Sequence, residues 1–237
     1  MSRTKEKMMI IDTETCNSVE EPIPYDIGYA IVDRTGHIYE KRSFVVADVF
    51  LDMKDVMQTA YYKEKIPKYW DDIRDGFRTL MTMWNIRKIM LEDMKKYNVK
   101  TVGAYNAGFD KRALNNLIRY VSKSWKRWWF PFGVKYICIW NMACQTLLNT
   151  STYIKFAEKN GLVSDYGNIQ TSAEACYKFL TKAVDFQEEH TGLEDVLIEV
   201  EILAKCYKTH KKMDTKINSS CWRLPQKKKK EMAVARA

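Results

Sequence analysis

Three short apolar runs near the start of the chain constrain the fold more than any other feature. Met8–Ile11 is followed by Ile27–Val32 and His37–Val46, and turn residues 33–36 separate the last two. Runs of this length, rich in isoleucine and valine, predict β-strands. We therefore expect the chain to begin with a strand followed by a β-hairpin.

Helical periodicity replaces the strand pattern after residue 50. Apolar residues recur at helical spacing in Leu51–Tyr62, Ile73–Tyr97 and Phe109–Val121. Two further strand-like runs, Val99–Tyr105 and Tyr136–Trp140, alternate with the helical segments. Further helices are predicted at residues 151–159 and 172–184. Three strands followed by alternating helices and strands predict an α/β fold with a central mixed five-stranded sheet flanked by helices.

The last predicted helix has the clearest start signal. Thr191 and Glu194 show the spacing of a capping box, and an apolar face continues from Leu193 toward a predicted end near Tyr207. Polar and basic residues follow, including Lys227–Lys230. We expect residues 1–210 to form one domain and residues 211–237 to form a mobile basic C-terminal tail.

The composition fits a soluble domain with an acidic partner. The chain has 237 residues, 46% of them hydrophobic, which is enough for one core. Its 39 Lys and Arg against 30 Asp and Glu give a net charge of +9, which suits nucleic acid but also serves solubility. The six cysteines show no CxxC pair and are expected to be reduced thiols rather than zinc ligands. Without a signal peptide or an apolar run of roughly 20 residues, a cytoplasmic protein with no membrane contact is expected.

Two carboxylates stand at the end of the first predicted strand. Asp12 and Glu14 directly follow the run Met8–Ile11. Residues two apart on a strand point to the same face, so both carboxylates are able to share a metal site. Hydrolysis of a phosphodiester bond by two metal ions needs several carboxylates around cations roughly 4 Å apart. An Asp-x-Glu pair alone fits equally well a strand that simply ends in polar residues.

Four segments carry informative residues in a fixed order. Three of them are Ile11-Asp12-Thr13-Glu14-Thr15, Tyr105-Asn106-Ala107-Gly108-Phe109-Asp110 and His190-Thr191-Gly192-Leu193-Glu194-Asp195. The fourth, Asp26–Ile31, contains an Ile-Gly pair followed by small and apolar residues. Together they resemble the three exonuclease motifs and an intervening strand of the DnaQ-like (DEDDh) 3′→5′ exonucleases, which belong to the ribonuclease H-like superfamily. The fold implied by this resemblance is the ribonuclease H-like exonuclease fold.

The resemblance implies an active site made of Asp12, Glu14, Asp110, His190 and Asp195. The four carboxylates would hold two divalent cations, Mg²⁺ or Mn²⁺, with Asp12 shared between them. His190 would act as the general base, since an imidazole with an ordinary pKa of about 6.5 accepts a proton readily near neutral pH. The implied reaction is hydrolysis at the 3′ end of a nucleic acid, releasing 5′-mononucleotides.

Taken singly, the residues of the second and third motifs also have a structural interpretation. Asp110 and Asp195 lie near predicted helix starts, where a carboxylate favours the helix dipole, and His190 fits a polar residue flanking a helix. The ordered conjunction of the motifs favours catalysis. Cys16 and Tyr105 stand where glycine and histidine are common in the family, which affects loop shape and substrate fit rather than the metal ligands.

Substrate contacts are expected in two places. The first is the motifs themselves, at Thr13, Thr15, Asn106 and Phe109. The second is the segment 123–130, which interleaves cations with aromatic rings and includes Trp125, Lys126, Arg127 and Trp128. Single-strand binders use this mixture for base stacking and phosphate contact. The alternative for this segment is packing on the core or on a partner subunit.

The expected partner is a nucleic acid with a free 3′ end. Single-stranded DNA is favoured over RNA, and the protein is expected to be a monomer or a homodimer. Three alternatives remain: a 3′→5′ exoribonuclease, a catalytically silent nucleic-acid-binding module of the same fold, and an assembly protein with a basic surface. The complete set of four carboxylates and His190 argues against the last two.

Overall fold

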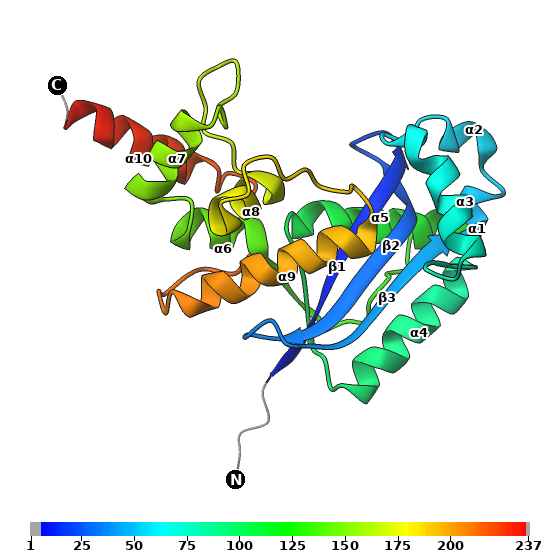
Figure 1. Ribbon diagram of the computed structural model, residues 1–237. Coiled ribbons are helices and arrows are strands. Elements are labelled where there is room, and N and C mark those ends of the chain that lie inside the picture. Colours follow the sequence, from blue (N-terminus) through cyan, green and yellow to red (C-terminus); the bar gives the residue numbers. More distant parts are fainter. Residues whose placement is uncertain (1–5, 236–237) are drawn as a thin grey trace, which may run out of the picture.

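The computed structural model describes residues 6–235 and shows one mixed sheet with helices on both faces (Figure 1). The strand order is β4-β3-β2-β1-β5-β6. The β1–β2 and β2–β3 pairs are antiparallel, and the other neighbours are parallel. The strands are β1 (Lys7–Asn17), β2 (Pro22–Asp33), β3 (Ile38–Val46), β4 (Thr79–Met81), β5 (Thr101–Ala104) and β6 (Lys135–Cys138). The predicted α/β fold is confirmed, but the sheet is six-stranded rather than five-stranded.

The two faces of the central strand β1 are covered by different helices. Met9 and Ile11 are buried in the cluster that includes α4 (Met83–Lys96) and α5 (Ala107–Ser122). Met8 and Ile10 are buried in the cluster that includes α9 (Gly192–Lys208). Because successive side chains on a strand point to opposite faces, Asp12 and Glu14 continue the face that α9 covers.

The remaining helices flank this framework. Residues of α6, α7 and α8 pack in the same cluster as α9, and Figure 1 shows these helices beside it. Their bounds are α6 (Ile139–Thr146), α7 (Ser151–Lys159) and α8 (Ala173–Thr181), and those of the segments after β3 are α1 (Ala47–Phe50), α2 (Lys54–Met57), the 3-10 helix η1 (Lys63–Lys65) and α3 (Ile66–Arg74). Within residues 6–235, none of the helices is both long and apolar enough to cross a membrane.

The helix predicted over Ile73–Tyr97 is interrupted, so this prediction is wrong. The helix α3 ends at Arg74, and the backbone N–H groups of Phe77 and Arg78 donate to the Asp72 carbonyl at 2.8 and 3.2 Å. Residues 79–81 then form β4 beside β3. The cause is a tertiary interaction that periodicity does not reveal: the Arg78 side chain is buried, and its guanidinium contacts acidic groups from distant segments.

Two other predicted elements differ in length. Of the helix expected over Leu51–Tyr62, only Lys54–Met57 is α-helical. The strand expected over Tyr136–Trp140 ends at Cys138, and α6 begins at the next residue. Here the apolar run continues from strand into helix without a turn residue, so hydrophobicity alone does not mark the boundary.

The C-terminal segment, expected to be a mobile basic tail, contains a helix. Residues Arg223–Val234 form α10, which packs against α7. Pro225 and Cys221 are buried at its start. The Gln226 side chain accepts from the Ile169 N–H at 2.8 Å and donates to the Ile169 carbonyl at 2.9 Å. These contacts anchor the helix that carries Lys227–Lys230.

Close backbone packing sets the position of α9 over the sheet. A Cβ atom on Gly28 of β2 would lie 2.2 Å from the backbone of Gly192 and Leu193. A Cβ atom on Gly192 would lie 2.7 Å from the Gly28 backbone nitrogen. Neither distance is sterically allowed, so glycine is needed on both sides for the first turn of α9 to reach the sheet.

We predict that Gly28→Ala destabilises the protein by about 1–3 kcal/mol, because the added methyl group must push α9 away from β2. The change is measured by thermal or denaturant unfolding. Gly108→Ala is the matched control, since the nearest atom to its Cβ is a side-chain methyl of Ile217 at 3.2 Å rather than backbone. Equal stability of the two variants would show that the backbone contact does not hold α9 in place.

Candidate active site

The five predicted catalytic residues come from four parts of the fold. Asp12 and Glu14 lie on β1, Asp110 in the first turn of α5, and Asp195 in the first turn of α9. His190 lies just before α9. Because the N-terminus of a helix favours negative charge, α5 and α9 both direct a favourable dipole toward the carboxylates they carry.

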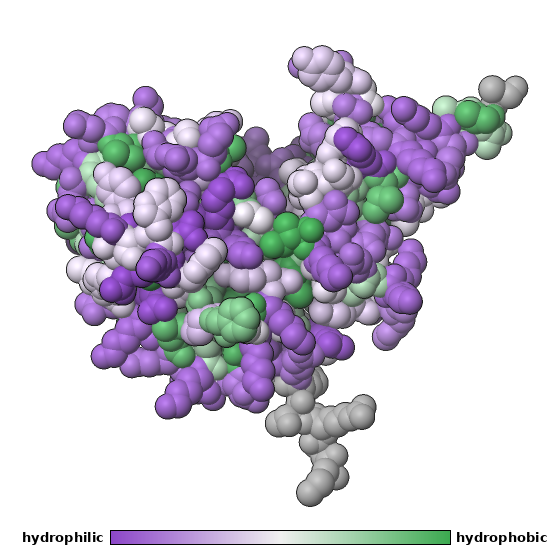
Figure 2. Space-filling view, turned by 180° about the vertical axis from the view of Figure 1, so that it is seen from behind, coloured by the Kyte–Doolittle hydropathy of each residue, from purple (hydrophilic) through white to green (hydrophobic). Residues whose placement is uncertain are grey.

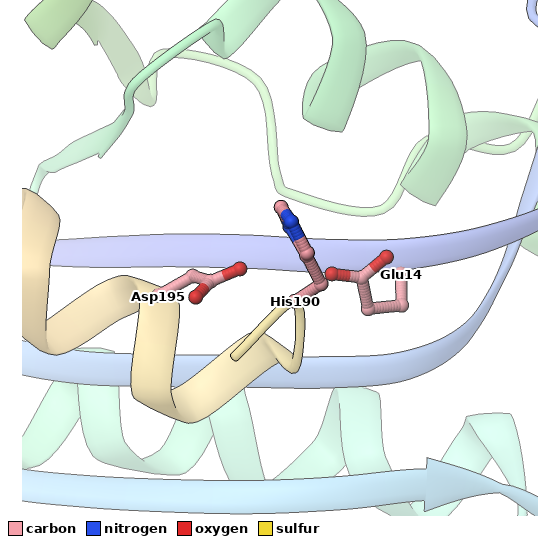
Figure 3. A group of neighbouring side chains, drawn as sticks. All are labelled: Glu14, His190 and Asp195. Carbon is pink, nitrogen blue, oxygen red and sulfur yellow. The ribbon is translucent and has the colours of Figure 1, made fainter. Parts of the chain in front are cut away.

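Three of these residues line one cavity of about 350 Å³. Its lining includes Asp12, Asp110 and Asp195. The side chains of Glu14, His190 and Asp195 form an adjoining group whose ligand atoms lie within 4.8 Å of one another (Figure 3). Asp195 therefore belongs to both arrangements. It shares the cavity with Asp12 and the adjoining group with Glu14.

Burial disfavours the charged form of each carboxylate, and repulsion between neighbouring carboxylates adds to it at Asp12 and Glu14. Burial, and then the charge of Asp110, raises the pKa of Asp12 well above its usual range. Burial and the nearby Asp26 raise the pKa of Glu14 to about 8. Burial raises the pKa of Asp110 to about 7 despite the opposing hydrogen bond from Thr13 Oγ1 at 2.9 Å.

The residues of this cavity suit a hard divalent cation. Burial, and then the Glu188 carboxylate, raises the pKa of Asp195 to about 8. Within the described chain, Asp195 Oδ1 and Glu199 Oε2 are buried and have no hydrogen-bond partner. Buried carboxylate oxygens without a partner are costly unless a cation compensates them. All the candidate ligands except His190 offer oxygen, which Mg²⁺ and Mn²⁺ prefer.

His190 is held by contacts on its face and its edge. The Tyr62 ring stacks on it at 4.2 Å between centroids and 9° between planes. Its Nδ1 atom lies 3.9 Å from Glu188 Oε2. Burial, and then the positive charge of Lys65, lowers the pKa of His190. The imidazole is therefore neutral near pH 7 and has a nitrogen free to accept a proton.

The predicted substrate contacts within the motifs divide into two groups. Thr13, Asn106 and Phe109 line the carboxylate cavity. Thr15 is half-buried on β1 and is not part of the lining. Asn106 is exposed, at the N-cap of α5, where it is accessible to a ligand.

The predicted aromatic and basic segment lies away from this cavity. Trp125 is 85% exposed, and it lines a separate cavity of about 640 Å³ that also includes Asn17 at the end of β1. Trp128 is 56% exposed, with the Arg119 guanidinium 4.3 Å from its ring. Lys126 and Arg127 are exposed as well. Trp129, by contrast, is fully buried, so the packing interpretation holds for this residue, and substrate contact by the exposed residues stays a prediction.

A buried ionic network behind the site is absent from the sequence prediction. The Arg78 guanidinium donates to Asp26 at 3.1 Å and to Glu194 at 2.8 Å. Asp26 also accepts from the Gly192 N–H at 2.9 Å and from the Tyr69 hydroxyl at 2.7 Å. The network fixes the start of α9, and with it Asp195, against β2.

The hydrogen bonds expected of the capping box at Thr191 and Glu194 do not form, and Asp26 of this network caps the helix instead. The Thr191 hydroxyl donates to Glu194 at 2.7 Å and makes no hydrogen bond to the N–H groups of the helix. Asp26, distant in sequence, accepts from the first N–H of α9 instead. The start of the helix was predicted correctly, but the wrong residue was expected to cap it.

Two further carboxylates were missed, Glu188 and Glu199, and both line the cavity. Glu199 follows Asp195 by four residues and therefore lies on the same face of α9. This spacing is visible in the sequence. The apolar pattern around it, however, gave no reason to expect an acidic side chain to be buried.

We predict that the metal-free protein loses stability as the pH rises from about 4 to about 8. The pKa values of Glu14 and Asp195 are raised to about 8, so the folded protein holds protons that the unfolded chain has already released. Stability is full below the ordinary carboxyl pKa of about 4 and falls as the pH passes through the raised values. Thermal unfolding in EDTA across this range measures the effect, and Asp110→Asn should make the dependence shallower.

Mn²⁺ should restore stability above pH 7, since cation binding requires the deprotonated carboxylates. A stability that stays constant or rises with pH in EDTA would contradict this account of the buried carboxylates.

Comparison with known proteins identifies the fold. No protein-family model matches the chain, and no curated protein matches it. Among solved structures, E. coli exonuclease I in complex with a 5cy-dT13 oligonucleotide is similar, with a TM-score of 0.51 and 16% identity, over 98% of this chain and 45% of that chain. Another structure of exonuclease I is similar with a TM-score of 0.50 and 14% identity, over 86% of this chain and 41% of that chain.

The chain thus spans less than half the length of these exonuclease I structures. At this level of identity the likeness concerns the fold. The sheet, its flanking helices and the match together give the chain the ribonuclease H-like fold of exonuclease I, as the sequence motifs predict.

Proposed function

We propose that the protein is a metal-dependent 3′→5′ exonuclease that hydrolyses phosphodiester bonds and releases 5′-mononucleotides. The observation that carries the proposal is the convergence of Asp12, Glu14, Asp110 and Asp195 beside His190, on a ribonuclease H-like sheet. The motif resemblance supports the polarity, 3′ to 5′, and the DEDDh type.

The chemistry follows from the site residues. Asp12, Glu14, Asp110 and Asp195 would hold two divalent cations, Mg²⁺ or Mn²⁺, which neutralise charge on the phosphate and make a water molecule more acidic. His190 accepts a proton from the attacking water, and its lowered pKa keeps it neutral for this role. The stacked Tyr62 ring holds the imidazole in one orientation.

Surface charge supports a polyanionic substrate. At the C-terminal end of α9, a cavity of about 870 Å³ is lined by the cationic residues Arg34, Lys205, Lys208, Lys211 and Lys212 and by His210. Among its described lining residues there is no carboxylate. Figure 2 shows a face dominated by hydrophilic side chains, with apolar groups in small separate patches. A charged polymer suits these surfaces better than an apolar ligand.

Single-stranded DNA is the favoured substrate. The exonuclease I structure that is similar to this chain is a complex with a 5cy-dT13 oligonucleotide. The exposed Trp125 and Trp128 offer stacking surfaces that suit unpaired bases. A 3′→5′ exoribonuclease is the second candidate, because the same site chemistry serves both sugars.

Digestion of 5′-labelled single-stranded DNA and RNA of one sequence tests the proposal. In Mg²⁺ or Mn²⁺ we expect a ladder that shortens from the 3′ end and disappears in EDTA. Asp12→Ala should abolish the ladder. His190→Ala should lower turnover about 10²–10⁴-fold, since general bases contribute on that scale, while oligonucleotide affinity is retained.

His37→Ala serves as the control, because His37 is an exposed histidine on the β2–β3 turn. If DNA and RNA both stay intact in Mg²⁺ and in Mn²⁺, the nuclease assignment is refuted. The alternative of a catalytically silent nucleic-acid-binding module would then remain. Unchanged turnover in His190→Ala would refute only the role of His190 as base.

We further predict that Trp125→Ala weakens binding of a long single strand by about tenfold, as expected for the loss of one stacked base. Fluorescence anisotropy with labelled oligonucleotides measures the affinity. Tyr166→Ala is the control, because Tyr166 is a similarly exposed aromatic residue at 93%. If both variants bind like the unmodified protein, the single strand does not pass over Trp125.

A further inference from the structure

Glu199 is a buried carboxylate at the site, beyond the four carboxylates that the motifs identify. It is 3% exposed and lies on α9, one turn after Asp195. It lines the same cavity as Asp12 and Asp110. It does not belong to the adjoining group formed by Glu14, His190 and Asp195.

A backbone hydrogen bond from Tyr105 favours the charged form of Glu199 and lowers its pKa, but it does not reach both carboxylate oxygens. Its Oε2 atom is buried and has no hydrogen-bond partner among the described residues. No Lys or Arg in the described chain forms an ion pair with it. Its nearest charged neighbours are carboxylates, Asp110 first. A buried acidic group in this setting is expensive unless a cation reaches it.

A packing role does not explain an acidic residue at this position. The residues around Glu199 on α9 include Val196, Val200 and Leu203, which are buried in the apolar cluster. An apolar side chain at position 199 would extend that cluster without any electrostatic cost. The Glu199 carboxylate instead lines the acidic cavity, and its Oε2 atom is available to bind a ligand.

We propose that Glu199 helps to hold a divalent cation at the Asp12–Asp110 end of the cavity through its unpartnered Oε2 atom. The inference rests on the proposed function, which places two cations at this site. Glu14 lies outside the lining of this cavity, in the adjoining group with His190 and Asp195. Asp195 belongs to both arrangements, whereas Glu199 lines only the cavity, so substitution of Glu199 should affect one cation more than the other.

Glu199→Gln keeps the size and shape of the side chain and removes its charge. Titration with Mn²⁺, followed by calorimetry, should show one cation site weakened by about 10–100-fold, the range for residues that support a metal site, and a second site unchanged. The rise in Tm on adding Mn²⁺ should be smaller than in the unmodified protein. The Tm of the metal-free variant should not fall, because a repelling charge has been removed.

Two further variants complete the experiment. Glu199→Asp retains the charge on a shorter side chain, so its Mn²⁺ affinity should lie between those of the unmodified protein and Glu199→Gln. Glu201→Gln changes an exposed glutamate on the same helix and should bind Mn²⁺ normally.

The outcomes separate this inference from the proposed function. If the unmodified protein binds Mn²⁺ and degrades DNA while Glu199→Gln binds Mn²⁺ with the same affinity, the inference fails and the proposed function stands. If Glu199→Gln lowers the metal-free Tm and leaves Mn²⁺ binding intact, Glu199 has a packing role. If the unmodified protein binds no divalent cation, both fail.

Discussion

The contact between the start of α9 and β2 is the constraint on which the rest of the site depends. Gly28 and Gly192 let the two backbones meet, and Asp26 accepts the first N–H of the helix at 2.9 Å. Arg78 ties Asp26 to Glu194 within the same network. This contact brings Asp195 and His190 over the β1 carboxylates. A helix shifted by even one residue would direct these side chains elsewhere, since residues along a helix turn through about 100° each.

The same packing creates electrostatic repulsion that divalent cations would relieve. Asp12, Asp110, Asp195 and Glu199 line one cavity, and neighbouring carboxylates raise the pKa of Asp12 and of Glu199. Without cations, bringing these carboxylates together on folding therefore costs free energy. Divalent ions would turn the conflict into a binding site, because they stabilise the deprotonated form that the protein interior disfavours. The close carboxylates thus lower the stability of the metal-free protein and would raise its affinity for divalent cations.

The sequence predicted the elements and residues that local patterns determine, and it missed those that tertiary contacts determine. The strands around Asp12 and the helix after Asp110 follow from hydrophobic period and motif spacing. The interruption at Arg78 does not, because two of its three acidic partners are 52 and 116 residues away. Glu199 was missed because an acidic residue on an amphipathic helix normally faces solvent. The helix α10 was missed because four consecutive lysines indicated a solvated tail, and the few apolar residues that anchor the helix gave only a weak helical pattern.

Crystallography of the protein soaked in Mn²⁺, with anomalous scattering recorded at the manganese edge, tests the central claim most directly. The claim is that this crowded acidic cavity is built for divalent cations. It predicts anomalous peaks inside the cavity, in contact with Asp12 and with carboxylates from α5 and α9. A soaked crystal with an intact fold and no manganese in the cavity would contradict the claim, and the buried carboxylates would then need another explanation.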